Sequence, residues 1–233
     1  MPRRADTNNP KRARSLAARA APRAFTLLET ALALVIVMVG VLAIMEAQTS
    51  FIRSNTWSSH EATATYLASE IRERLRQLPR HDPTTGLSFQ GPPGSQVLVG
   101  VGPETGELTV DDMDDIDDYN QVLFGLNGTH PGPIDAFGTI IPQIDPDGFV
   151  VLGAGGLPEP LQGWSQYVEV QKVDPYHLSN PRAWEDVDNP NLPFPGRTVD
   201  AFPLQVTVTI FYQGIYDPAP DIVTRMTWIA PVR

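Results

Sequence analysis

The sequence predicts an α+β protein in which a long N-terminal helix packs on a C-terminal antiparallel β-sheet. Three observations support this prediction. An apolar run near the N-terminus is followed by an apolar stripe at helical spacing, and the last third of the chain holds segments with the alternation typical of strands. The 23 prolines and 18 glycines lie nearly all after residue 78, which indicates a loop-rich C-terminal domain.

Residues 1–24 are predicted to be a basic leader peptide that stays in the cytoplasm, and the family resemblance given below implies that it is removed. They carry seven Lys/Arg and one acid, Asp6, whereas the rest of the chain carries ten basic and 26 acidic residues. An acidic body lacks the clustered Lys/Arg that bind phosphates, so we expect no nucleic-acid partner. The chain has no cysteine, which excludes disulfides and thiolate chemistry.

Residues 25–48 are predicted to be the transmembrane and assembly half of the helix. From Phe25 to Met45 the chain has a single charge, Glu29, and as a helix this stretch is about 31 Å long, enough to cross a bilayer core. The positive leader precedes it, so the N-terminus is expected in the cytoplasm and the bulk of the chain outside. The residues expected to line the membrane segment are Ala31, Leu34, Val37, Val41 and Ile44.

Residues 49–78 are predicted to be the amphipathic half of the same helix. Its apolar stripe recurs at spacings of three and four residues. The stripe consists of Ala64, Leu67, Ile71, Leu75 and Leu78. Pro79 is expected to end the helix, and Glu70 and Arg74 are expected to pair on the solvent side.

The N-terminal motif resembles a known family. Ala24 followed by "FTLLE" (residues 25–29) and a long apolar helix is similar to the cleavage and methylation signal of type IV pilins and type II secretion pseudopilins. The segments "ALVIVMVGVLAIMEAQ" and "ATYLASEIRERLRQLP" are similar to minor pilins of the PilV type and to the minor pseudopilin I group. The resemblance covers about the first 78 residues.

The sequence departs from the family's pattern at two points. Ala24 stands where the family usually has glycine, a substitution expected to slow cleavage. Major pilins usually carry a proline late in the apolar segment, and none occurs between Phe25 and Leu78. The second departure favours a minor pilin or pseudopilin over a bulk filament subunit.

The resemblance implies roles for three residues. Prepilin peptidase would cut between Ala24 and Phe25 and methylate the new amine of Phe25. Glu29 would face the N-terminal ammonium of a neighbouring subunit, which offsets the cost of desolvating its carboxylate. The alternative reading of Glu29 is an interfacial acid stabilised by the dipole at a helix N-terminus.

Residues 79–233 are predicted to form the exterior α+β head. Segments with strand composition are residues 95–102, 148–153, 167–173, 203–213 and 222–231. The last two flank "GIYDPAPD", which predicts a hairpin connection. The alternating apolar residues from Leu204 to Tyr212 are expected to pack on the helical stripe, and residues 79–93 and 177–197 are expected to be irregular.

The segment "DDMDDIDDYN" is the most unusual polar feature of the head. Its acids are Asp111, Asp112, Asp114, Asp115, Asp117 and Asp118. Carboxylates so close repel one another unless a cation is present, and hard oxygen ligands suit calcium, although the glycine of an EF-hand loop is missing. The alternative is a solvated acidic turn or helix. No other cofactor is expected.

Other sequence features give no support for catalysis. The four histidines are scattered, and no nucleophile elbow, Walker loop or dinucleotide fingerprint occurs. The chain is therefore not expected to be an enzyme. The aromatic residues Trp164, Tyr167, Trp184 and Trp228 suggest either core packing, which we favour, or a recognition surface.

Together these features predict a minor pilin or pseudopilin of a type IV pilus or type II secretion pseudopilus. Its expected location is the inner membrane, single-pass with the head periplasmic or extracellular, and then the filament. The expected partners are other pilin or pseudopilin subunits, prepilin peptidase, the inner-membrane assembly platform and membrane lipid. The alternative is a signal-anchored periplasmic binding or catalytic domain that does not polymerise.

Overall fold

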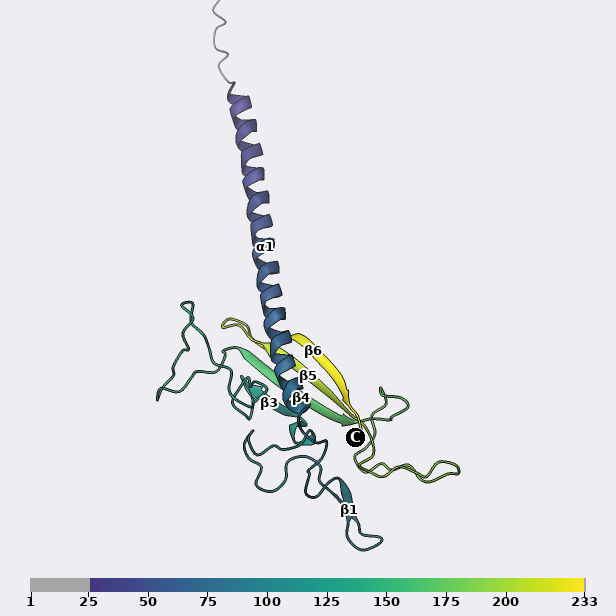
Figure 1. Cartoon of the computed structure of the whole chain (residues 1–233). Helices are drawn as coiled ribbons and strands as arrows, with labels where there is room; N and C mark the ends of the chain where they lie inside the picture. The colour runs from purple at the N-terminus through teal and green to yellow at the C-terminus, as the bar shows by residue number, and fades with distance from the viewer. Residues whose placement is uncertain (1–25, 233) are drawn as a thin grey trace, which may run out of the picture. The chain divides into compact units, whose positions relative to one another are not determined.

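The computed structural model describes residues 26–232, so the predicted leader and the predicted processing residues Ala24 and Phe25 lie outside the described residues. Figure 1 shows one long helix and a β-rich C-terminal part. The elements are α1 (Leu27–Leu75), β1 (Ser88–Gln90), β2 (Val97–Val99), a 3-10 turn (Asp117–Tyr119), β3 (Val122–Gly125), β4 (Trp164–Lys172), β5 (Leu204–Tyr212) and β6 (Asp221–Ala230). The predicted α+β class is confirmed.

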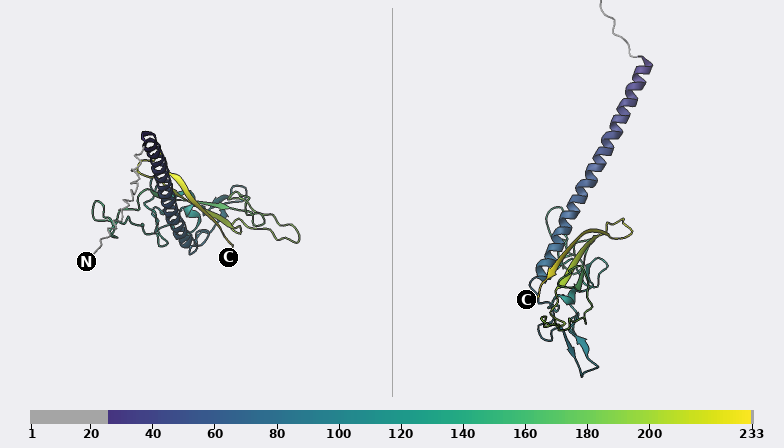
Figure 2. Two further views of the ribbon diagram at one scale, coloured as in Figure 1. Left: turned by 90° about the horizontal axis from the view of Figure 1, so that it is seen from above. Right: turned by 90° about the vertical axis from the view of Figure 1, so that its right-hand side faces the viewer.

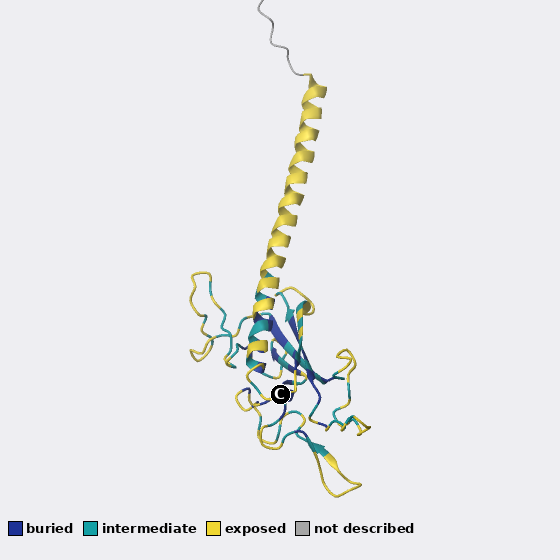
Figure 3. Ribbon diagram, turned by 45° about the vertical axis from the view of Figure 1, so that its right-hand side comes forward, coloured by how far each residue is buried: buried dark blue, intermediate teal, exposed yellow. Residues whose placement is uncertain are grey.

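The chain divides into two compact units, the first ending at Arg53 and the second beginning at Ser54. In the first unit, α1 begins after Thr26, whose Oγ1 accepts a hydrogen bond from the Glu29 N–H at 3.3 Å. A threonine three residues before a glutamate is the pattern of a capping box, which explains why the helix begins here. All described residues of this unit are exposed, as the yellow part of α1 in Figure 3 shows.

In the second unit, α1 contributes one buried face. Its buried residues are Ala64, Leu67, Ala68, Ile71 and Leu75. This confirms the predicted stripe from Ala64 to Leu75 and adds Ala68 to it, whereas Leu78, also predicted on the stripe, lies beyond the end of the helix and is partly buried. The helix ends at Leu75, and the N–H groups of Gln77 and Leu78 bond to carbonyls three residues back, a tighter turn that leads into Pro79.

Glu70 and Arg74 each bond to loops of the head instead of forming the expected pair with each other. Glu70 Oε2 accepts a hydrogen bond from the Ala136 N–H at 2.8 Å. Arg74 donates from Nη2 to the Val110 carbonyl at 2.7 Å and from Nε to the Tyr119 hydroxyl. Both side chains therefore hold loops of the head on the helix. Buried backbone N–H and C=O groups must find hydrogen-bond partners, whereas an exposed ion pair adds little stability.

The main sheet has the antiparallel order β3-β4-β5-β6. Tyr167 lies opposite Thr209 in the β4–β5 pair, and Val206 lies opposite Trp228 in the β5–β6 hairpin. The strands predicted at 167–173, 203–213 and 222–231 and the hairpin between the last two are confirmed. β3 was not predicted.

Two short strands form a separate hairpin, drawn in teal at the bottom of the right-hand view in Figure 2. β2 lies within the predicted segment 95–102, and its partner β1 lies within a segment expected to be irregular. The strand predicted at 148–153 is wrong. Val150 and Leu152 make only isolated bridges to Ile144 and Pro158, because short turns on both sides fold the chain back on itself.

The core lies between the buried face of α1 and one face of the sheet. In β5 the predicted alternation is confirmed, with Leu204, Val206, Val208 and Ile210 buried in the same apolar cluster as the helical stripe. Each such side chain stabilises the fold by about 1.5 to 3 kcal/mol. Trp164 is buried in this cluster and Trp184 and Trp228 pack against it, which confirms core packing for these three.

Candidate functional site

The first candidate site is the N-terminal part of α1. The five residues predicted to line the membrane segment, Ala31, Leu34, Val37, Val41 and Ile44, are all exposed. α1 is long and apolar enough to cross a membrane. The Glu29 side chain is exposed in the first turn, where an acid is favoured by the helix dipole.

The second candidate site is the acidic segment that precedes β3. Asp111, Asp112 and Asp114 are exposed, whereas Asp115, Asp117 and Asp118 are each 0% exposed. The prediction of a solvated acidic turn or helix is therefore wrong for these three residues. Of the acidic segment, Asp117–Tyr119 form a turn of 3-10 helix, and the aspartates before it lie in turns rather than in an α-helix.

Reciprocal hydrogen bonds fold this segment. Asp115 Oδ1 accepts from the N–H groups of Asp117 and Asp118 at 2.8 and 3.1 Å. Asp118 Oδ2 accepts from the N–H groups of Asp114 and Asp115 at 3.1 and 3.2 Å. Aspartates close such turns readily, and each of the two carboxylates uses one oxygen to do so.

Packing contacts then bury the segment. The Ile116 N–H donates to the Pro79 carbonyl at 3.0 Å, and Arg74 bonds to Val110 and Tyr119 on either side of the aspartates. Met113, Ile116 and Tyr119 belong to the apolar core. The apolar residues interleaved with the aspartates therefore carry the carboxylates into the interior.

Two of the predicted ligands have other roles. Asp112 Oδ2 accepts from the N–H and hydroxyl of Thr109 at 2.9 and 2.7 Å, which lowers the pKa of Asp112. Asp117 Oδ2 lies 3.0 Å from His81 Nδ1. Burial lowers the pKa of His81 to about 4, so at neutral pH the imidazole is uncharged and this contact is a hydrogen bond rather than an ion pair.

Two glutamates missed by the sequence analysis complete the cluster. One carboxylate oxygen from each of Glu104, Glu107 and Asp118 lies within 4.8 Å of the others, and so does one from each of Asp114, Asp115 and Asp118. Asp118 is common to both groups. The glutamates precede the aspartates by several residues, and only the i,i+3 spacing of two acids near an acidic run signalled them.

Burial and the closeness of other carboxylates raise the pKa values of several acids in this cluster. Burial raises the pKa of Asp115 to about 9 and that of Asp118 to about 7. The pKa of Glu104 is also raised to about 7, by burial first and then by the close approach of the Glu107 carboxylate and the neighbouring charges of Asp115 and Asp118. Charged oxygens in this arrangement favour either protons or a metal cation.

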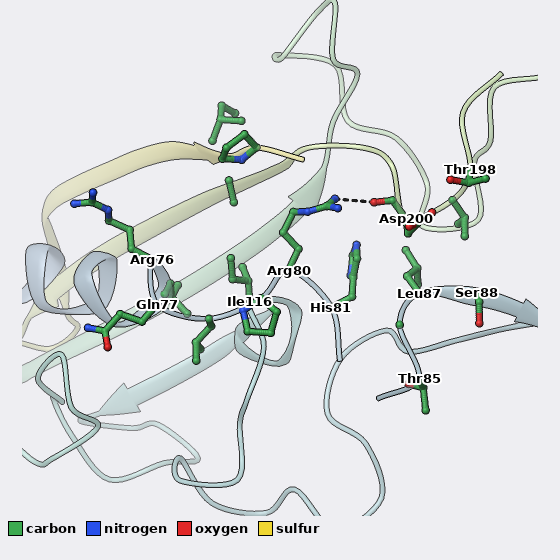
Figure 4. A pocket seen from close by; sticks show the side chains of 18 of the residues that line it. Arg76, Gln77, Arg80, His81, Thr85, Leu87, Ser88, Ile116, Thr198 and Asp200 are labelled. Carbon is green, nitrogen blue, oxygen red and sulfur yellow. Dashed lines mark hydrogen bonds between the residues drawn. The ribbon is translucent and has the colours of Figure 1, made fainter. Parts of the chain in front are cut away.

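A cavity of about 1160 Å³ lies between the loop after α1 and the end of β6. Figure 4 shows Arg80 at its centre, with its guanidinium directed at Asp200. Arg80 Nη1 donates to the carbonyls of Asp200 and Phe202 at 2.7 and 2.6 Å, and His81 uses Nδ1 on Asp117. These polar groups tie loops together, and their arrangement indicates no particular reaction.

Comparison of the chain with protein-family models, with curated proteins and with solved structures finds no match.

Proposed function

We propose that this chain is a minor pilin or pseudopilin, a structural subunit of a type IV pilus or type II secretion pseudopilus. In this proposal prepilin peptidase cuts between Ala24 and Phe25 and methylates Phe25. The subunit waits in the inner membrane with its head outside and then joins other subunits through the assembly platform. The N-terminal motif and the α+β fold both support the assignment.

The observation that carries the proposal is that one helix has two different surfaces. From Leu27 to Arg53 every residue of α1 is exposed and most are apolar, whereas the residues between Ala64 and Leu75 supply five side chains to the core of the head. An apolar surface this long needs lipid or other subunits to cover it. A simple membrane anchor would not need its own helix to form part of the core of the domain it carries.

The proposed role of Glu29 is to set the position of the subunit in the filament. Its exposed carboxylate is a single acid in a long apolar surface. Packed among other helices it would lose water, and a neighbouring subunit's N-terminal ammonium would compensate that loss. In the isolated chain the helix N-terminus stabilises the same charge.

A Glu29→Ala variant tests this role. We expect the variant to be cleaved and methylated but to enter filaments roughly tenfold less, because an unpaired buried ammonium costs more than 1.4 kcal/mol. Sheared filament fractions quantified by immunoblot provide the measurement, and the exposed Glu61→Ala change on the same helix is the matched control. Equal incorporation of Glu29→Ala and the native chain would contradict the proposal.

Mass spectrometry of the mature N-terminus separates the two candidate functions. We expect a chain that begins with N-methylated Phe25. An uncut chain would support the alternative, a signal-anchored periplasmic domain that does not polymerise.

A further inference from the structure

The buried carboxylates before β3 contain oxygens that the protein itself leaves without partners. Asp115 Oδ2, Asp117 Oδ1, Asp118 Oδ1 and both side-chain oxygens of Glu104 are buried and accept no hydrogen bond from the described residues 26–232. Asp115 and Asp118 are each 0% exposed. Leaving a buried charged oxygen unpaired costs several kcal/mol, so a fold that retains several of them needs a further partner.

The second observation is the spacing of the ligand oxygens. The two groups, Glu104 with Glu107 and Asp118, and Asp114 with Asp115 and Asp118, each have one oxygen per residue within 4.8 Å of the others. Carboxylate oxygens that lie this close together can bind one cation between them, and calcium takes six to eight oxygen ligands, several of which can be carboxylates. Magnesium binds at about 2.1 Å and keeps several waters, so a cage built from five carboxylates suits it less well.

We propose that Glu104, Glu107, Asp114, Asp115 and Asp118 bind one calcium ion, with Asp118 as the common ligand. Asp118 and Asp115 each hold one oxygen on backbone N–H groups, which orients the other oxygen toward the ion. Glu104 and Glu107, on a more exposed part of the loop, close the site from the other side. Asp111, Asp112 and Asp117 are not ligands.

The ion would fasten the segment 104–118 to the head. The segment is already attached to α1 through Arg74 and to the loop after α1 through the Ile116 N–H. Without the ion these contacts hold a cluster of mutually repelling carboxylates in place. A bound calcium ion attracts each of these carboxylates and offsets their mutual repulsion. Calcium should therefore stabilise the folded head rather than merely attach to its surface.

Calcium binding is tested on the full chain in detergent micelles. We expect one calcium ion per chain by isothermal titration calorimetry, with a dissociation constant of roughly 10⁻⁵ M. Relative to EDTA, 1 mM calcium should raise the thermal midpoint by roughly 5 °C, and 1 mM magnesium should raise it far less. No binding, or a larger shift with magnesium, would overturn the proposal.

Two ligand variants distinguish binding from general damage to the fold. Asp118→Asn and Glu104→Gln keep side-chain size but remove charge, so each should weaken calcium binding about tenfold or more. In EDTA the same variants should raise the thermal midpoint, because each relieves repulsion among the carboxylates. Asp111→Asn, an exposed change in the same segment, should leave both quantities unaltered.

The combination of weaker calcium binding and a more stable calcium-free protein cannot come from misfolding. If the two ligand variants bind calcium like the native chain, the ligand assignment is wrong. If they lower the midpoint in EDTA, the proposed repulsion is wrong. Filament assembly is not measured here, so this outcome is independent of the Glu29 experiment.

Discussion

Replacing Gln166 by leucine should lower the free energy of unfolding of the head by roughly 3 kcal/mol. Gln166 is 0% exposed in β4, and its Oε1 accepts from the Ile134 N–H at 2.7 Å. Its Nε2 donates to the carbonyls of Ile134 and Leu67, both at 3.0 Å. One amide therefore joins the sheet, the helix α1 and the loop before Ile134.

The expected loss follows from the groups that leucine would leave behind. Both backbone groups of the buried Ile134 would lose their partner, and each buried unsatisfied group costs about 1 to 3 kcal/mol. Leucine has nearly the volume of glutamine, so cavity formation adds little. Urea titration of the full chain in micelles, followed by tryptophan fluorescence, to which the buried Trp164 contributes, measures the change.

Gln205→Leu is the matched control for this prediction. Gln205 lies half-buried on β5, and the side-chain hydrogen bond that it donates to the Leu178 carbonyl is long at 3.4 Å. Its replacement should change stability by about 0.5 kcal/mol or less. If Gln166→Leu behaved like this control, the amide would not be the link between helix, sheet and loop.

Local periodicity explains why much of the fold was predictable. The stripe from Ala64 to Leu75 and the alternation from Leu204 to Ile210 are patterns within single elements, and burial follows them. Gln166 and Lys172 break the pattern, because they are polar residues on the buried face of β4 and their partners lie outside the sheet, in α1 for Gln166 and in the loop at Trp184 for Lys172. β3 was missed because four residues are too few for a clear alternation.

The acidic segment shows where sequence reasoning ends. Composition indicated carboxylates that could bind a cation, but burial of Asp115 and Asp118 depends on contacts with Pro79 and α1 that no local pattern reveals. For the same reason the sequence does not reveal that Asp117 lies next to His81, 3.0 Å from its Nδ1. Conversely, the composition of residues 148–153 favours a strand, yet this stretch pairs only through isolated bridges with neighbours in the same loop and forms no continuous ladder.

The stability of the calcium-free head should fall by roughly 2 to 4 kcal/mol as the pH rises from 6.5 to 8. The ordinary pKa of aspartate is 3.8, whereas the pKa of Asp115 is raised to about 9 and those of Asp117 and Asp118 to about 7. Between these values the folded chain keeps protons that the unfolded chain has released. Stability then decreases as pH increases, by about 1.4 kcal/mol per pH unit for each proton so held.

Two other groups, His81 and Lys172, change stability with pH in the opposite direction, but mainly outside the range from pH 6.5 to 8. The pKa of His81 is lowered to about 4, so His81 makes stability rise with pH mainly below its ordinary pKa of 6.5. The pKa of Lys172 is lowered to about 8, so Lys172 makes stability rise with pH mainly above pH 8.

Urea titrations in EDTA at several pH values should show the fall in the native chain and in the exposed Asp111→Asn variant. Asp115→Asn should flatten the profile and be more stable at pH 8, because the amide keeps the turn hydrogen bonds and is neutral without binding a proton on folding. A native profile that is flat or rises across this window would show that the buried carboxylates do not retain their protons.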